Sequence, residues 1–138
     1  MLSPSLEDYL EELYKLYIDN KAFKIRDLAS KLSVSSPSVV KALKKLHNNN
    51  YVIYKKYKGI TLTEKGKSLG KSLVKRNDIL QEFLIIIDSN CNPEEEAEAM
   101  EHYLSPSTVE TFKTLSTFLK DNNDILEKFK QYKKNKSD

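Results

Sequence analysis

Cysteine is nearly absent from the sequence, which contains only Cys91, and glycine is scarce, with three residues among 138. A single cysteine cannot form an intrachain disulfide, which fits a reducing compartment, and we interpret Cys91 as an incidental loop residue. No run approaches the roughly 18 apolar residues of a membrane span, and no basic and apolar signal segment follows Met1. We therefore expect a cytoplasmic protein without a membrane partner. Scarce glycine and helical periodicity predict a mainly α fold.

Charged residues are sorted along the chain, although the formal net charge is only +3. Residues 1–20 carry a net charge of −4, residues 21–76 of +13 and residues 77–110 of −9, with no lysine or arginine in the last of these blocks. A strongly basic block is suited to a polyanion, whereas an acidic block repels itself unless solvent, salt or a bound cation offsets the charge. The sequence thus predicts two sites of opposite sign.

The pattern of residues 3–46 predicts a helix-turn-helix unit. Ser3 and Pro4 are typical of a helix start, and leucines follow at helical spacing to about residue 19. A short helix over residues 25–32 precedes a third helix, which Ser36 and Pro37 are expected to cap. Two short helices joined by a tight turn are typical of a DNA-binding unit, although helical hairpins that do not contact DNA look alike.

A β-hairpin is predicted directly after this unit. The β-prone runs Tyr51–Tyr54 and Ile60–Leu62 flank a turn with Gly59. A hairpin in this place is a wing, and its lysines and tyrosine are suited to lying along DNA phosphates, although the segment alone could be a solvated loop. The candidate DNA-binding residues are Ser36, Pro37, Ser38, Lys41, Lys44 and Lys45 on the third helix, and Lys55, Lys56, Tyr57 and Lys58 at the wing tip.

Thr63 is expected to cap a longer helix, whose lysines and Arg76 form a second basic strip. After Arg76 the chain is apolar almost all round, which a surface helix of a lone small domain does not tolerate. We expect this segment to pack against a second copy, because a homodimer fits the two half-sites of a palindromic operator. The alternative is that C-terminal helices, one predicted by a capping box from Ser107 to Glu110, cover it within one chain. The candidate dimer-interface residues are Ile79, Leu80, Phe83, Leu84 and Ile87.

The acidic block has the spacing of a metal site. Asn92 and Pro93 are expected to begin a helix that presents two carboxylates and an imidazole on one face, and the first helix presents two carboxylates three residues apart. Structural explanations exist as well, since a carboxylate can complete a capping box and a lone histidine is more often structural than a ligand. The candidate ligands are Glu98, Glu101 and His102, with Asp8 and Glu11 on the first helix.

Together these motifs resemble the manganese transport regulator branch of the diphtheria toxin repressor family. The similarity is carried by residues 5–11, the helix over 41–46, the wing segment 51–63 and the Glu98-x-x-Glu101-His102 motif, and it extends over nearly the whole chain. Members of that branch are dimeric winged-helix repressors of metal-uptake genes, without the extra C-terminal domain of the longer iron-sensing members. The resemblance implies that the candidate ligands hold family ligand positions, in a site that can contain two manganese ions.

Position 77 departs from this pattern, because the family has a ligand histidine where the sequence has Asn77. An asparagine oxygen is a weaker, neutral ligand. Either the site binds fewer ions, or Asp78 or a water takes the place, or the selectivity differs, and Asn77 is kept as a candidate ligand. Leu10 and Glu98 stand where the iron-type relatives have methionine and cysteine, which favours Mn²⁺ over Fe²⁺.

We therefore predict a mainly α protein with two domains. Residues 1–71 would form a winged helix-turn-helix DNA-binding domain with a two-stranded wing, and residues 72–138 a helical metal-binding and dimerisation domain. The predicted function is a repressor of manganese or iron uptake genes that a divalent cation activates for operator binding; the alternative is a metal-independent winged-helix regulator. An enzyme is not expected, because paired Glu-x-x-His motifs, a nucleophile elbow and a phosphate loop are absent from the sequence.

Overall fold

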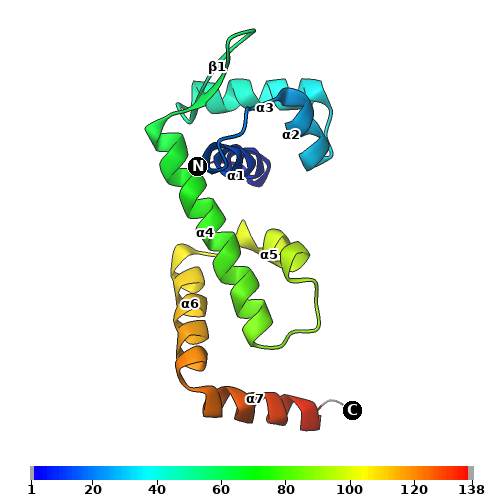
Figure 1. Cartoon of the computed structure of the whole chain (residues 1–138), viewed down its shortest axis with the longest axis vertical. Coiled ribbons are helices and arrows are strands. Elements are labelled where there is room, and N and C mark those ends of the chain that lie inside the picture. The colour runs from blue at the N-terminus through cyan, green and yellow to red at the C-terminus, as the bar shows by residue number, and fades with distance from the viewer. Residues whose placement is uncertain (1, 137–138) are drawn as a thin grey trace. The chain divides into compact units, whose positions relative to one another are not determined.

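The computed structural model describes residues 2–136 and is mainly helical, as the sequence predicts (Figure 1). The chain divides into two compact units, unit 1 over Met1–Val74 and unit 2 over Lys75–Asp138, and each is described by itself. Within residues 2–136, no helix is long and apolar enough to span a membrane. The elements are α1 (Pro4–Ile18), α2 (Ile25–Leu32), α3 (Ser36–Asn48), β1 (Val52–Lys55), β2 (Gly59–Leu62), α4 (Glu64–Ile86), α5 (Pro93–Glu101), α6 (Pro106–Asp121) and α7 (Asn123–Lys136).

Several helices begin with one local signal, a capping side chain followed within two residues by proline. The capping residues are Ser3 for α1, Ser35 for α3, Asn92 for α5 and Ser105 for α6. In each case the side-chain oxygen accepts a backbone N–H three residues on, as in the 3.2 Å bond from the Ser38 N–H to the Ser35 Oγ. Ser36 and Ser107 were wrong predictions for the caps, because proline occupies the first turn, where its missing N–H costs nothing, and the cap precedes that turn.

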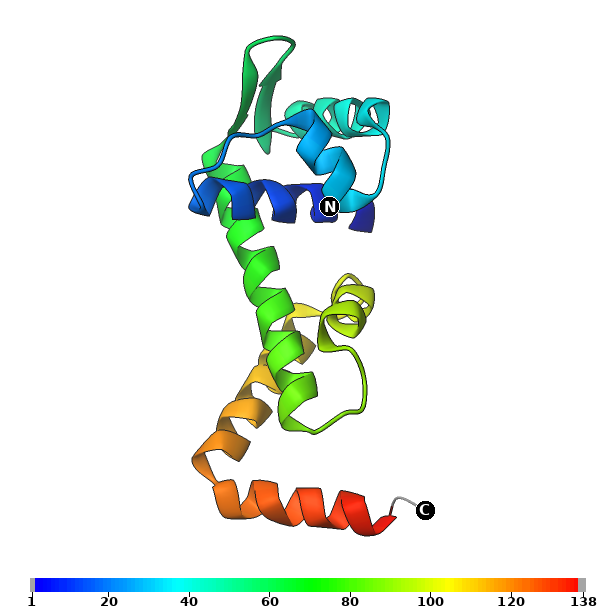
Figure 2. The same ribbon diagram turned by 45° about the vertical axis from the view of Figure 1, so that its right-hand side comes forward.

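The core of unit 1 lies between α1, α2, α3 and the hairpin, and it contains the wholly buried Leu10, Leu13 and Leu43. The strands β1 and β2 pair antiparallel, with Val52 opposite Leu62, and both of these side chains are buried. Figure 2 shows the hairpin beside α3 within this unit. The period-2 alternation of a strand therefore places one face of the hairpin on the core and leaves the other to solvent.

Unit 1 also contains a close approach between the start of α4 and the residue before the hairpin. The Thr63 Oγ1 accepts the Gly66 N–H at 3.0 Å, so the prediction that Thr63 caps this helix is confirmed. A Cβ placed on Gly66 would lie 1.9 Å from the carbonyl oxygen of Tyr51. Only glycine allows this approach of helix to backbone.

The smaller core of unit 2 contains Leu80, Leu84, Ala97 and Val109 from α4, α5 and α6. Beside it the rings of Phe83 and Phe112 stack, with centroids 4.2 Å apart and planes 4° apart. In Figures 1 and 2, α6 runs alongside the second half of α4. The helices after residue 90 therefore cover part of the apolar segment within one chain.

Candidate nucleic-acid interface and metal centre

The helix α3 separates a buried face from a basic, exposed face. Its buried side chains are Val39, Ala42, Leu43 and Leu46. All the predicted DNA-binding residues of this helix are exposed, namely Ser36, Pro37, Ser38, Lys41, Lys44 and Lys45. The apolar stripe therefore holds the helix on the core while the lysines face solvent, where they can reach DNA phosphates or base edges.

The tip of the wing is exposed and has an unusual backbone. The Lys58 N–H donates to the Lys55 carbonyl at 2.9 Å and closes the turn. Tyr57 has a φ of 68° and its side chain is 94% exposed, with the Lys56 Nζ 5.2 Å from the centroid of its ring. A bulky side chain at positive φ is uncommon, and here it presents an aromatic ring between lysines, a composition suited to a nucleic-acid backbone.

The wing is also joined to α3, through a residue that sequence reasoning did not single out. The Tyr54 N–H donates to the Nδ1 of His47 at 3.1 Å. This bond connects the middle of β1 to the last turn of the helix that carries the candidate lysines. No motif predicts it, because the bond depends on how the hairpin folds back onto α3.

The predicted second basic strip is not uniform. The Lys65 Nζ donates to the Asn49 carbonyl at 3.0 Å and lies 4.3 Å from the centroid of the Tyr51 ring, so it holds the junction between α3 and the hairpin. The Nζ of Lys67 lies 3.2 Å from the Oε1 of Glu64 and forms an ion pair with it. Arg76 takes part in the contacts of unit 2 described below. The strip therefore includes structural contacts, and its sequence pattern alone overstates the surface offered to DNA.

On α1 the two candidate ligands have different surroundings. Asp8 is half-buried, whereas Glu11 is buried and lies 3.6 Å from the Nζ of Lys15. Burial lowers the pKa of Lys15, but the carboxylates of Glu12 and Glu11 outweigh it and raise the pKa above its ordinary value. A lysine already neutralises part of this acidic face. Since Ser3 caps the helix, the alternative in which Asp8 completes a capping box with Ser5 is not observed.

In unit 2, three of the candidate ligands come together where α5 ends beside α4. Glu101 is fully buried, and its Oε1 lies 3.5 Å from the Nε2 of His102. The Asn77 Nδ2 donates to the Oε2 of Glu101 at 3.1 Å. Glu98 is exposed, one helical turn before Glu101 on α5. A buried carboxylate beside an imidazole is an oxygen and nitrogen donor pair that fits Mn²⁺ or Fe²⁺, and burial makes a compensating cation favourable.

Arg76 and Gln81 also belong to this cluster, and neither was a predicted site residue. The Arg76 Nε lies 3.9 Å from the Oε2 of Glu101, and its Nη2 lies 3.3 Å from the Nδ1 of His102. Because arginine only donates, the Nδ1 of His102 accepts this bond. The Nε2 of Gln81 donates to the Oδ1 of Asn77. The i, i+4 spacing of Asn77 and Gln81 was the signal that could have identified Gln81.

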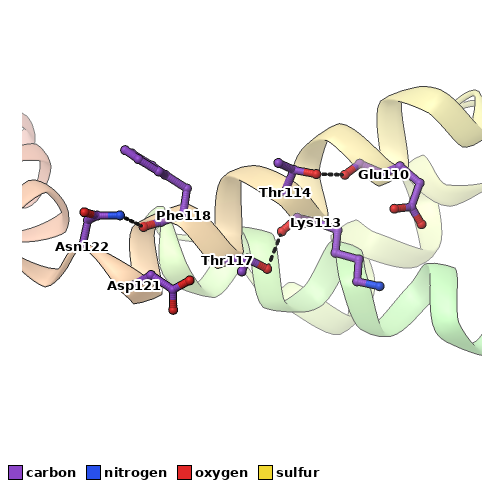
Figure 3. A pocket seen from close by; sticks show the side chains of 7 residues that line it. All are labelled: Glu110, Lys113, Thr114, Thr117, Phe118, Asp121 and Asn122. Carbon is purple, nitrogen blue, oxygen red and sulfur yellow. Dashed lines mark hydrogen bonds between the residues drawn. The ribbon is translucent and has the colours of Figure 1, made fainter.

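A shallow hollow of about 370 Å³ lies on α6, apart from these candidate ligands (Figure 3). Its threonine hydroxyls donate to carbonyls of their own helix, as in the 3.0 Å bond from Thr114 to Glu110. The hydroxyl groups of Thr114 and Thr117 are therefore hydrogen-bonded within α6 itself. The lining residues are Glu110, Lys113, Thr114, Thr117, Phe118, Asp121 and Asn122.

Two family models match the chain along its length. Residues 1–60 match the one described as "Iron dependent repressor, N-terminal DNA binding domain", and residues 63–130 match "Iron dependent repressor, metal binding and dimerisation domain". The chain is 39% identical over 138 residues to the "HTH-type transcriptional regulator MntR" of Lysinibacillus sphaericus (strain C3-41), covering 96% of both chains. It is 38% identical over 125 residues to the regulator of that name in Bacillus subtilis (strain 168), covering 88% of this chain and 86% of the relative.

Solved structures show the same fold. "Structure of the manganese regulator SloR" is similar with a TM-score of 0.73 at 32% identity, over 85% of this chain and 55% of that one. "Crystal Structure of the Manganese-activated Repressor ScaR: apo form" is similar with a TM-score of 0.63 at 32% identity, over 78% of this chain and 52% of that one. The chain thus spans about half the length of these two proteins, while it covers nearly all of the regulators above.

Proposed function

Because this chain belongs to the iron-dependent repressor family, we propose that it represses metal-uptake genes by binding a palindromic operator as a homodimer loaded with Mn²⁺. The membership makes it a metal-responsive DNA-binding transcriptional regulator rather than an enzyme, as the sequence predicts. We further propose that the DNA-binding domain covers residues 1–71, that the metal-binding and dimerisation domain covers residues 72–138, and that the protein acts in the cytoplasm, where it can reach its operator.

The observation that carries this proposal is the pairing of the fully buried Glu101 with the half-buried His102. A carboxylate with no exposed surface is costly to maintain unless hydrogen bonds and positive charge compensate it. Arg76 supplies one positive charge within 4 Å, at a distance of 3.9 Å. The pair lies in the part of the chain that matches the metal-binding family model, which supports the proposal that these two side chains bind a cation.

The donor chemistry favours manganese. Four carboxylates and one imidazole form a hard, oxygen-rich set, which suits Mn²⁺ first and Fe²⁺ second, because soft thiolate ligands are missing from it. The similar proteins of known structure point the same way, since one is described as a manganese regulator and the other as a manganese-activated repressor. Another structure of the second protein is described as having bound Zn2+, so competing metals belong in any test. The proposed ligands are Asp8, Glu11, Glu98, Glu101 and His102.

The apolar segment of α4 supports dimerisation. Leu80 and Leu84 are buried within one chain, whereas Ile79, Phe83 and Ile87 are only half-buried. Ile85 in the same segment is 62% exposed, and α6 and α7 expose further large apolar side chains. We propose that the half-buried side of this segment meets a second copy, because a small protein rarely leaves so much apolar surface in water. The α3 helices of the two copies would then face the two half-sites of the operator.

The proposed activation uses charge. The ligand set carries four negative charges that repel one another without a cation. When bound, the metal ion supplies the positive charge that lets carboxylates of α1 in unit 1 and of α5 in unit 2 act as one set. Holding the two units in one arrangement would favour one spacing between the α3 helices of the dimer. The dimer would therefore favour an operator whose half-sites have that spacing.

The test is a titration of operator DNA against the full chain, with DNA selected from a random pool in the presence of Mn²⁺. We expect EDTA to weaken binding by about 5- to 150-fold, the usual range of allosteric coupling. Glu98→Ala should weaken both Mn²⁺ binding and DNA binding, whereas Glu95→Ala, the same change at an exposed position of the same helix, should leave both unchanged. DNA binding that ignores both EDTA and Glu98→Ala would support the metal-independent regulator instead.

A further inference from the structure

Asn77 belongs to a chain of hydrogen bonds that ends on the buried carboxylate of unit 2. Its Nδ2 donates to the Oε2 of Glu101 at 3.1 Å, and its Oδ1 accepts from the Nε2 of Gln81 at 2.5 Å. Asn77 and Gln81 lie four residues apart on α4 and so share a face of the helix, while Glu101 is the last residue of α5. The chain of bonds therefore joins two helices at the candidate metal centre.

The chemistry of the three groups allows one orientation of the Asn77 amide. An ionised carboxylate only accepts hydrogen bonds, so the amide must turn its NH₂ group toward Glu101. The Oδ1 then faces Gln81, which supplies an NH₂ donor of its own. In this arrangement each bond of the chain joins a donor to an acceptor, whereas the reverse orientation of Asn77 would place two oxygen acceptors against each other at Glu101.

This orientation decides what Asn77 can do for a cation. An amide nitrogen has no lone pair to give to a metal, and the oxygen, which could coordinate, is engaged with Gln81. Acting as a ligand would require Asn77 to turn over and to lose both hydrogen bonds. We infer that Asn77 is a positioning residue, held by Gln81, that orients the Glu101 carboxylate for the cation and supplies no ligand atom itself. This inference rests on the proposed function, since it assumes that Glu101 binds a cation.

The two roles predict effects of opposite sign when Gln81 is changed. If Asn77 positions Glu101, replacing Gln81 with leucine removes the donor that fixes the amide, and the carboxylate is held less well. If Asn77 is instead a ligand, the same change frees its oxygen and strengthens metal binding. Leucine suits this half-buried helical position, so we expect the substitution to leave the fold intact. Gln131→Leu, the same change at an exposed position of α7, is the matched control.

The experiment measures Mn²⁺ affinity and stoichiometry by calorimetry and electron paramagnetic resonance on the full chain without DNA. We expect Asn77→Ala to weaken Mn²⁺ binding by about 10- to 100-fold, as changes to residues that orient ligands usually do, and Gln81→Leu to weaken it by about tenfold. The double variant should bind no more weakly than Asn77→Ala alone, because Gln81 acts through Asn77. Gln131→Leu should match the wild type.

Tighter Mn²⁺ binding by Gln81→Leu, unchanged binding, or additive losses in the double variant would each overturn the inference. Thermal unfolding of the metal-free variants shows whether a loss of binding reflects a loss of fold, and a metal-free Asn77→Ala that unfolds well below the wild type would make the role structural and so overturn the inference. Failure of the wild type itself to bind Mn²⁺ is a different result and would count against the proposed function.

Discussion

The two units of the chain differ in the size of their cores and in the surroundings of their buried carboxylates. Unit 1 has a large core, mostly of leucines and valines from its helices and from both strands, and its buried Glu11 lies beside Lys15. Unit 2 has a small core, a fully buried Glu101 beside His102 and Arg76, and exposed aromatic residues such as Tyr103 at 81% and Tyr132 at 65% exposure. A unit with a large core of its own can stand alone, whereas a unit with a small core and a fully buried carboxylate is suited to completion by a cation and a second copy.

The largest change in the free energy of unfolding is expected from a pair of core truncations, one in each unit. Leu43→Ala in unit 1 and Leu84→Ala in unit 2 each remove a buried side chain, and each should lower the free energy of unfolding by about 2–5 kcal/mol. Hydrogen exchange by mass spectrometry should show the loss of protection in the unit that carries the substitution. Equal loss in both units would show that they unfold as one body and that unit 1 does not stand alone.

A second variant separates the surfaces of the two units. Lys41→Ala combined with Lys45→Ala removes two exposed charges from α3 and should weaken operator binding by about 10- to 1,000-fold, since at least one lysine would reach base edges. Mn²⁺ binding should stay at the wild-type level. Lys128→Ala combined with Lys134→Ala on α7 is the control of equal charge, and a similar loss there would place the DNA surface elsewhere.

Gly66→Ala tests the tight junction of unit 1. The added methyl group would meet the Tyr51 carbonyl oxygen at 1.9 Å, so backbone must shift, and we expect a loss of about 1–3 kcal/mol in the free energy of unfolding. Ser68→Ala, at an exposed position on the same helix, should change stability little. Denaturant titration measures both, and a neutral Gly66→Ala would mean that the junction is looser than the structure indicates.

The smallest effect is expected at a surface ion pair of unit 2. Lys120 on α6 pairs with Glu82 on α4, and both side chains are about half exposed, at 55% and 46%. Because solvent screens such pairs, Lys120→Ala should lower the free energy of unfolding by less than about 1 kcal/mol. A larger loss in thermal unfolding would show that this pair, rather than the apolar contacts, holds α6 on α4.

Much of the fold was predictable because it depends on local patterns. Serine or asparagine before proline marks several helix starts, and the alternation around Gly59 marks the hairpin, since capping and strand periodicity act over a few residues. Two caps were wrong by one or two residues because neighbouring serines compete for the role. The division between residues 74 and 75 lies close to the predicted limit at residue 71, and that limit stays a proposal.

The candidate site was predictable only in part. The spacing of Glu98, Glu101 and His102 follows from helix geometry, but spacing does not distinguish the exposed Glu98 from the fully buried Glu101. Arg76 was interpreted as one of a strip of basic residues, whereas the structure turns it toward Glu101 and His102. Burial depends on which helix packs on which, and that packing is set by contacts far apart in sequence.

The sequence by itself determined the order of helices and strands, the sorting of charge into basic and acidic blocks, and the residue types from which each site is built. These properties depend on side-chain chemistry and on periodicities of two or 3.6 residues, which any stretch of chain displays. Only the tertiary structure decided which way the Asn77 amide faces and which carboxylate is buried away from solvent. Both depend on α5 ending against α4, a meeting of residues 24 positions apart that no local pattern encodes.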